Sequence, residues 1–199
     1  FALTCVLLYY LLSYLLPQRK DTPFFLSIAF IASLLFAAHP IHTEAVSNIK
    51  GRDEIMGLFF ALLTLLAAVK YVKTQRMVHL FWGMGAYILG LLSKENAVTF
   101  LAIIPLTFYF FTKAKPKDYL VTLGLYVLPV ALFLFMRTTF TASGLTEDSP
   151  EILNNPFAYC KGFEERYATI IYTFLLYIKL LIFPHPLSHD YYYNQIPYV

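Results

Sequence analysis

The chain has 199 residues, of which 59% are hydrophobic and only 14% charged, with a formal net charge of +3. A soluble domain carries about 25% charged residues, so this composition excludes a disordered chain, a nucleic-acid-binding module and an ordinary cytosolic enzyme. Two cysteines are too few for a disulfide framework. The mean hydropathy of +0.62 indicates a membrane protein, and a lipid bilayer is therefore the first expected partner.

Apolar segments follow one another along the chain, separated by polar links. A helix that crosses the ~30 Å hydrocarbon core needs roughly 20 mostly apolar residues, although several of these segments are shorter. The sequence predicts an all-α fold, a polytopic transmembrane helical bundle of about seven spans. The fourth and fifth spans are either a tight hairpin or a re-entrant pair. The segments are Phe1–Leu16, Phe24–Ala38, Ile55–Val72, Val78–Leu92, Ala97–Thr112, Tyr119–Met136 and Tyr167–Phe183.

We divide the chain into three parts: a membrane core at residues 1–136, an external loop at 137–166, and a further span with an aromatic, polar tail at 167–199. In the loop, Asn155 and Pro156 are an N-cap residue and a first-turn residue. They predict an interfacial helix, with an ordinary linker as the alternative. The tail lies in the cytoplasm if all seven segments cross, and outside if one does not.

Basic residues distinguish the two sides of this predicted membrane domain. Lys and Arg are in excess in cytoplasmic loops, and three short links are rich in them. We expect these links in the cytoplasm and the longer links on the periplasmic or lumenal side, where function on loops is expected. The cytoplasmic basic residues are Arg19, Lys20, Lys70, Lys73, Arg76, Lys113, Lys115 and Lys117. The external links are His39–Glu54, Ser93–Asn96 and Arg137–Arg166.

The first external link, HPIHTEAVSNIKGRDE, combines histidine, carboxylate, amide and basic side chains. Gly51 provides a turn before Arg52, and the guanidinium of Arg52 is a forked donor suited to phosphate. The alternative is a solvated connector in which Arg52 pairs with Asp53.

Two histidines and a glutamate in this link, His39, His42 and Glu44, raise the alternative of a zinc site. The His-Glu-x-x-His helix of zinc enzymes is missing, and Pro40 should end the preceding span at His39 and break the helical spacing. We therefore assign no metal ligand. Carboxylates and an asparagine are also ligand types that suit Mg²⁺ or Mn²⁺, which the sequence does not demand.

The second external link places Lys94 and Glu95 between two apolar segments. Charged residues in such positions are costly and are often functional. Adjacent helical residues do not face each other, so we expect Lys94 and Glu95 to serve different partners. The alternative is an interfacial turn with snorkelling side chains. Arg137, which opens the third external link, is a further candidate cation.

Three blocks of the sequence occur in a fixed order and carry a resemblance. They are HPIHTEAVSNIKGRDE, LLSKENAV and NNPFAYCKGFEERYATIIYTFLLYIKLLIFPHPLSHDYYY. Together they resemble the transmembrane and tetratricopeptide-repeat (TPR) protein family, and the third block is similar to the domain of unknown function in that family.

The resemblance implies a GT-C-type glycosyltransferase. Such an enzyme moves a sugar, mannose in the animal relatives, from a polyprenyl- or dolichyl-phosphate donor to a hydroxyl of an acceptor protein on the external side. It also implies a main catalytic acid or base before Phe1 and a TPR array after Val199. The short basic loops favour a bacterial inner membrane, whereas a eukaryotic member would lie in the endoplasmic reticulum membrane.

For this reaction, cations are needed to stabilise charge that grows on the departing phosphate, and a carboxylate is needed as general base. The phosphate-binding candidates are Arg52, Lys94 and Arg137. The supporting candidates are His39, His42, Glu44, Asp53 and Glu95. The alternative function is a non-enzymatic membrane anchor for a TPR interaction array, which has no need for charges gathered on one side. A transporter needs charges near span centres, and only Lys179 lies within a span.

Overall fold

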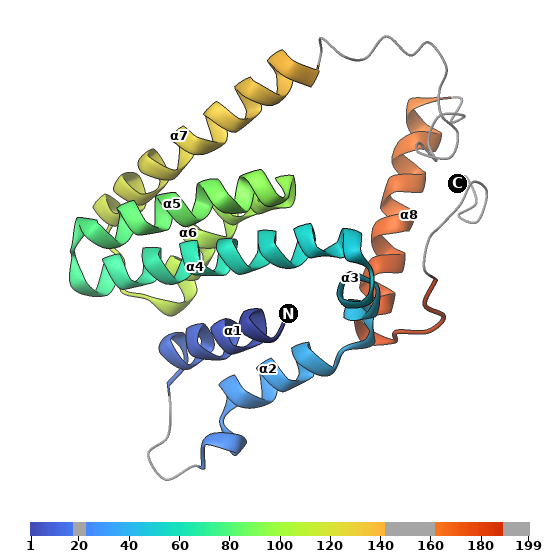
Figure 1. The fold of residues 1–199 in the computed structure, drawn as a ribbon, viewed down its shortest axis with the longest axis horizontal. Helices are drawn as coiled ribbons and strands as arrows, with labels where there is room; N and C mark the ends of the chain where they lie inside the picture. Colours follow the sequence, from blue (N-terminus) through green and yellow to red (C-terminus); the bar gives the residue numbers. More distant parts are fainter. Residues whose placement is uncertain (18–22, 142–161, 189–199) are drawn as a thin grey trace. The chain divides into compact units, whose positions relative to one another are not determined.

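The computed structural model describes residues 1–17, 23–141 and 162–188, and the regular structure in these ranges is helical. The chain divides into two compact units, Phe1–Ser143 and Gly144–Val199, and Figure 1 shows their elements. The α-helices are α1 (Ala2–Leu15), α2 (Ile28–Ala38), α3 (Thr43–Ser47), α4 (Arg52–Thr74), α5 (Met77–Ser93), α6 (Phe100–Phe111), α7 (Pro116–Thr141) and α8 (Phe163–Ile182). Short 3-10 helices are η1 (Phe24–Leu26), η2 (Pro40–His42), η3 (Ile49–Gly51) and η4 (Glu95–Thr99).

Each of the seven predicted apolar segments falls on a helix, and local signals explain several helix ends. Ser27 caps α2, because its hydroxyl accepts a hydrogen bond from the Phe30 amide at 3.2 Å. At the other end of α2, His39 is extended before Pro40, as a residue before proline prefers. The all-α prediction is confirmed for the described residues, and so is the end of α2.

The predicted number of membrane spans is wrong. Among the described residues, only Ile49–Thr74 and Pro116–Thr139 are long and apolar enough to cross a membrane. The helix α2 and the helical segment Pro40–Ser47, whose axes are bent by 49°, add a third span if they are counted as one. Length and charge explain the difference. The helices α1, α5 and α6 are short, with 14, 17 and 12 residues. The helix α8 is long enough, with 20 residues, but it carries Glu164, Glu165, Arg166 and Lys179.

The core of the first unit is built on the antiparallel pair α4 and α5, against which α1, α6 and α7 pack. Its largest fully buried side chains include Tyr87, Tyr126 and Phe108. Outward-facing side chains are also apolar, such as Trp82, which is 77% exposed. Exposed apolar surface of this extent is typical of a face that contacts lipid or another protein.

One close contact holds α7 against this helix pair. Gly83 of α5 is buried, and a Cβ added there would overlap the Tyr126 hydroxyl and lie 2.9 Å from the Ala67 Cβ of α4. Tyr126 is itself fully buried, so its ring has no room to retreat. The missing side chain of Gly83 therefore sets how closely α4, α5 and α7 approach.

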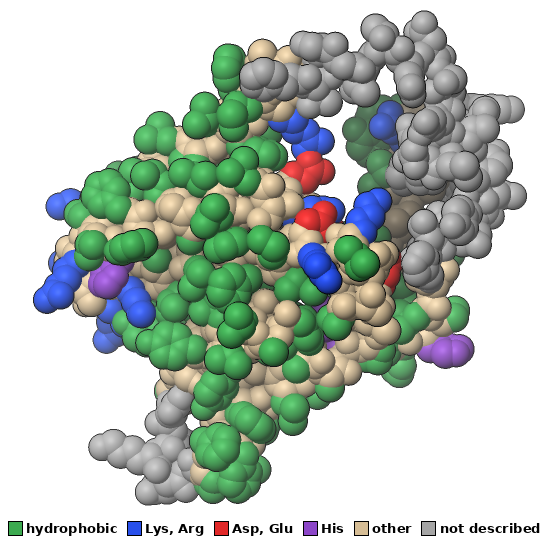
Figure 2. All heavy atoms as spheres, viewed as in Figure 1, with side chains coloured by type: hydrophobic (Ala, Val, Ile, Leu, Met, Phe, Trp, Pro, Cys, Tyr) green, Lys and Arg blue, Asp and Glu red, His purple; other side chains and the backbone are tan. Residues whose placement is uncertain are grey.

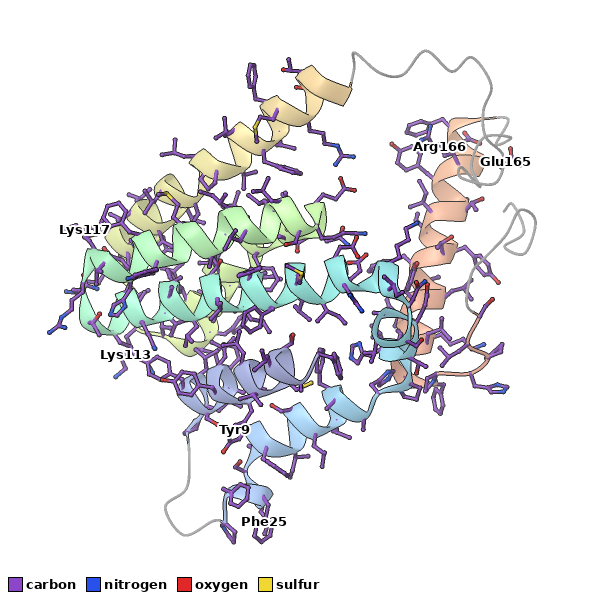
Figure 3. The ribbon with its side chains drawn as sticks, viewed as in Figure 1. Tyr9, Phe25, Lys113, Lys117, Glu165 and Arg166 are labelled. Carbon is purple, nitrogen blue, oxygen red and sulfur yellow. The ribbon has the colours of Figure 1, made fainter. Side chains whose placement is uncertain are left out.

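The two ends of the first unit differ in charge (Figure 2). Basic residues gather at the end where α4 is followed by α5. Figure 3 shows Lys113 and Lys117 at this same end. Lys73 lies 3.7 Å from the centroid of the Tyr14 ring and donates to the Tyr14 carbonyl at 2.8 Å. The opposite end holds both acidic and basic groups. This separation is the one that the distribution of Lys and Arg predicted.

The predicted boundaries between the parts of the chain do not all coincide with helix ends. α7 continues through the expected boundary at residues 136 and 137 and ends at Thr141. The expected interfacial helix at Asn155 and Pro156, as well as most of the polar tail, lies outside the described residues. In the second unit, α8 begins at Phe163, and Figure 3 shows Glu165 and Arg166 near its start.

Candidate functional site

Five charged residues gather where α4 begins and where α5 and α7 end. We call them the charged cluster: Asp53, Glu54, Lys94, Glu95 and Arg137. Asp53 and Glu54 stand in the first turn of α4, where carboxylates are favoured by the positive end of the helix dipole. Lys94 and Glu95 follow the last residue of α5. Figure 2 shows acidic and basic side chains interleaved at this end of the first unit.

Lys94 connects the end of α5 to the start of α4. Its Nζ lies 2.9 Å from Glu54 Oε1 and 3.0 Å from Asp53 Oδ2. Hydrogen bonds to Glu54 and Asp53 raise the pKa of the Lys94 ammonium above its usual range, so Lys94 is positively charged at neutral pH. The alternative in which Asp53 pairs with Arg52 is not what the structure shows, since Asp53 is engaged by Lys94.

Glu95 turns to a different partner. Its carboxylate pairs with the Arg137 guanidinium near the end of α7, and both side chains are about half exposed. The pair joins α7 to the turn after α5, and exposed pairs of this kind contribute little to stability. Lys94 and Glu95 thus serve separate partners, as predicted. Beside them is an open hollow of about 560 Å³ whose apolar wall includes Leu91 and Phe133.

A second cavity of about 280 Å³ reaches from the charged cluster into the apolar part of the first unit. Apolar side chains line its walls, among them Phe36, Ile55, Leu58, Ala61 and Phe100. Polar groups line it as well, among them His42, Glu54, Lys94 and Asn96. A cavity with apolar walls and charged groups fits an amphiphilic ligand, whose tail and head have opposite solvation needs.

The remaining sequence candidates lie around this cavity in different ways. The His42 ring lies against Phe36, with the ring centroids 4.4 Å apart. The Nδ1 of His39 accepts a hydrogen bond from the Ile41 amide at 3.2 Å. Glu44 and Arg52 are exposed, and neither lines the cavity. His39, His42 and Glu44 do not assemble as a metal site, since no group of three such ligands comes together among the described residues.

Glu54 is the residue that sequence reasoning missed. It pairs with Lys94 and lines the cavity, whereas Asp53, which was selected, pairs with Lys94 without lining it. The spacing of residues along the helix could have identified Glu54. It lies three residues before Gly57 and seven before Ala61, so all three share one face of α4. Both of these residues line the same cavity.

Gly57 allows Lys94 to come this close to α4. A Cβ at Gly57 would lie 2.9 Å from the Lys94 Cβ, closer than side chains pack. Gly51 has a related role, because a Cβ there would lie 2.5 Å from the Ala45 carbonyl oxygen. Gly51 ends the 3-10 turn η3 directly before Arg52, as predicted, but its φ of −72° is open to any residue, so glycine is required there for the close approach.

Replacing Gly57 by alanine is therefore expected to destabilise the protein, because the turn that carries Lys94 must move away from α4. Overpacking of this kind costs about 1–3 kcal/mol, which exceeds the gain of about 1 kcal/mol from better helix propensity. Thermal unfolding in detergent measures the change. Gly124→Ala is the matched control, because a Cβ at Gly124 meets nothing within 4 Å. Equal stability of the two variants would contradict the close contact.

Comparisons with known proteins identify the chain's relatives. Residues 150–199 match the family model described as protein O-mannosyl-transferase TMTC, DUF1736. The chain is 32% identical to protein O-mannosyl-transferase F38B6.6 of Caenorhabditis elegans over 84% of its length and 23% of that protein. No solved structure matches the chain.

Vertebrate relatives show the same extent of similarity. The chain is 32% identical to human protein O-mannosyl-transferase TMTC2 over 84% of its length and 22% of that protein. It is 34% identical to the Xenopus laevis tmtc2 protein over 85% of its length and 22% of that protein. The chain thus spans less than a quarter of the curated relatives that it matches. Its long apolar helices and these relatives indicate an integral membrane protein, and the matches show that the chain belongs to the TMTC family.

Proposed function

We propose that this protein is a membrane-embedded O-mannosyltransferase that moves mannose from a dolichyl- or polyprenyl-phosphate donor to a hydroxyl group of an acceptor protein. The observation that carries the proposal is the cavity of the charged cluster. It combines apolar walls with the ammonium of Lys94, as a lipid with a phosphate head requires. The names of the relatives, protein O-mannosyl-transferase, support the same reaction class.

The proposed reaction breaks the bond between mannose C1 and the phosphate oxygen of the donor and forms a bond from C1 to the acceptor hydroxyl oxygen. Negative charge grows on the departing phosphate, and a fixed cation stabilises it. Lys94 is the cation that lines the cavity. The hydroxyl proton passes to a base, and His42 and Glu54, which line the same cavity, are groups that can accept it.

The other candidates take more distant roles in this proposal. Asp53 orients Lys94 through its hydrogen bond of 3.0 Å. Arg137 and Glu95 pair with each other between α7 and the turn that carries Lys94. Arg52, exposed in the first turn of α4, is placed to meet a phosphate outside the cavity. We assign no divalent metal to the reaction, because the carboxylates of the cluster are engaged by Lys94 and Arg137.

We place the reaction on the lumenal side of the endoplasmic reticulum membrane. The basic links at the other end of the first unit favour the cytoplasm for that end, which leaves the charged cluster on the lumenal side. A bacterial inner membrane, favoured by the short loops, gains no support from the relatives named above, which are animal proteins.

A donor test addresses this proposal. Full-length protein reconstituted in vesicles is expected to transfer mannose to an acceptor protein from dolichyl-phosphate mannose and not from a water-soluble nucleotide sugar. Dolichyl phosphate is expected to stabilise the purified protein against unfolding by about 2.7 kcal/mol at a hundredfold excess over its dissociation constant.

Dolichol without phosphate is the matched control, because it offers the same tail and no charge for Lys94. Transfer from the nucleotide sugar alone would refute the lipid-donor mechanism. A complete lack of transfer, with equal stabilisation by dolichol and dolichyl phosphate, would instead favour a membrane anchor for an interaction array.

A further inference from the structure

A groove of about 500 Å³ lies between α4 and α5, and it shares no lining residue with the cavity of the charged cluster. Its volume is within the range of ligand pockets, ~300–1,000 Å³. One face of each helix lines it, since the residues recur every three or four positions. They are Leu63, Ala67 and Lys70 of α4 and His79, Trp82 and Ala86 of α5.

The middle of the groove is apolar and open. A Cβ at Gly85, another lining residue, would meet nothing within 4 Å, so the backbone of α5 leaves free space there. Trp82 is 77% exposed and Leu89 48% exposed, and both line the groove. An open groove between two apolar helices suits a flexible hydrocarbon chain.

Two groups that can bind an anion lie toward one end of this groove. Lys70 is four residues before the end of α4 and His79 is in the first turn of α5, so both are near the link that joins these helices. The Lys70 Nζ lies 5.4 Å from the centroid of the Tyr10 ring. Within the described ranges, no carboxylate forms an ion pair with Lys70 or His79.

We propose that this groove binds an anionic phospholipid, with one acyl chain along Trp82 and Gly85 and the headgroup phosphate at Lys70 and His79. Lys70 and His79 favour an anionic lipid over a neutral one, because basic pockets between helices in a membrane bind acidic head groups. The same end of the first unit also carries the exposed Lys73, in the last turn of α4, and the exposed Arg76, just before α5, which adds to the attraction. This lipid site is independent of the proposed transferase reaction.

Native mass spectrometry of the purified full-length protein tests the proposal. Titration with phosphatidylserine is expected to show one saturable site, and phosphatidylcholine to bind more weakly. Lys70→Gln is expected to weaken phosphatidylserine about fivefold, since a basic residue near anionic lipid contributes about 1 kcal/mol and 1.4 kcal/mol is tenfold. Gly85→Leu should abolish binding, because a leucine fills the open groove.

Gly124→Leu is the matched control, since Gly124 also faces open space but lies on α7, and it should bind phosphatidylserine as the unchanged protein does. Ala86→Leu is a second blocking variant in case Gly85→Leu does not fold. Full binding by a folded blocking variant would overturn the proposal, as would equal affinity for phosphatidylcholine or displacement of the lipid by glycerol phosphate. A blocking variant that instead converts a dimer into a monomer would show that a second copy occupies the groove.

Discussion

Replacing Lys94 by methionine is expected to lower mannose transfer about a hundredfold. Removal of a fixed donor to a developing anion costs on the order of 3 kcal/mol, and Lys94 is the cation that lines the proposed donor cavity. The substitution keeps the length of the side chain and leaves Asp53 and Glu54 without the partner that they share. Transfer from dolichyl-phosphate mannose by vesicles with equal amounts of folded protein measures the loss.

Lys113→Met is the matched control for this prediction. It removes one exposed lysine at the basic end of the first unit (Figure 3) and should leave transfer near its original rate. Glu54→Gln is expected to have an intermediate effect, because Lys94 keeps its contact with Asp53 while the cavity loses one carboxylate. Full transfer by a folded Lys94→Met protein would show that Lys94 only joins two helices.

Replacing Gly83 by alanine is expected to reduce the free energy of unfolding by about 3 kcal/mol, at the upper end of the usual cost of overpacking. The new methyl group would overlap the Tyr126 hydroxyl and press on Ala67. Because Tyr126 is fully buried, the ring cannot turn outward without separating α7 from α5. Thermal or denaturant unfolding of the detergent-solubilised protein reports the change.

Tyr126→Phe provides a specific check of this contact. The buried Tyr126 hydroxyl has no hydrogen-bond partner among the described residues, so its removal alone should be neutral or stabilising. In combination with Gly83→Ala it should restore part of the lost stability, because the overlapping oxygen is gone. Gly85→Ala, two residues along the same helix and facing open space, should cost nothing. Independent effects of Gly83→Ala and Tyr126→Phe would argue against the contact.

Helix positions were predictable from the sequence because they depend on local properties. The seven predicted apolar segments all fall on helices, whereas α3 lies in a link that the sequence did not predict as helical, and Pro40 predicted the end of α2. The number of spans was not predictable in this way. Several short apolar helices can either cross the membrane or pack inside the protein, and composition does not distinguish these outcomes.

The candidate site was partly predictable for the same reason. Charged residues at the ends of apolar segments are costly, and this rule selected Asp53, Lys94, Glu95 and Arg137, which the structure brings together in two ion-paired groups. The rule did not distinguish Glu54 from Asp53, because neighbours in sequence point in different directions on a helix. Glu54 shares a face of α4 with Gly57 and Ala61, but only the tertiary structure shows that this face lines the cavity.

By itself the sequence determined an all-helical membrane protein, the separation of basic links from a mixed charged surface, and the resemblance that led to its family. The tertiary structure alone decided which charges are partners, which of them line a cavity, and where α4, α5 and α7 touch. These depend on contacts between residues such as Gly83 and Tyr126, which lie 43 positions apart. A packing distance of this kind follows from the positions of whole helices, which no local pattern of residues records.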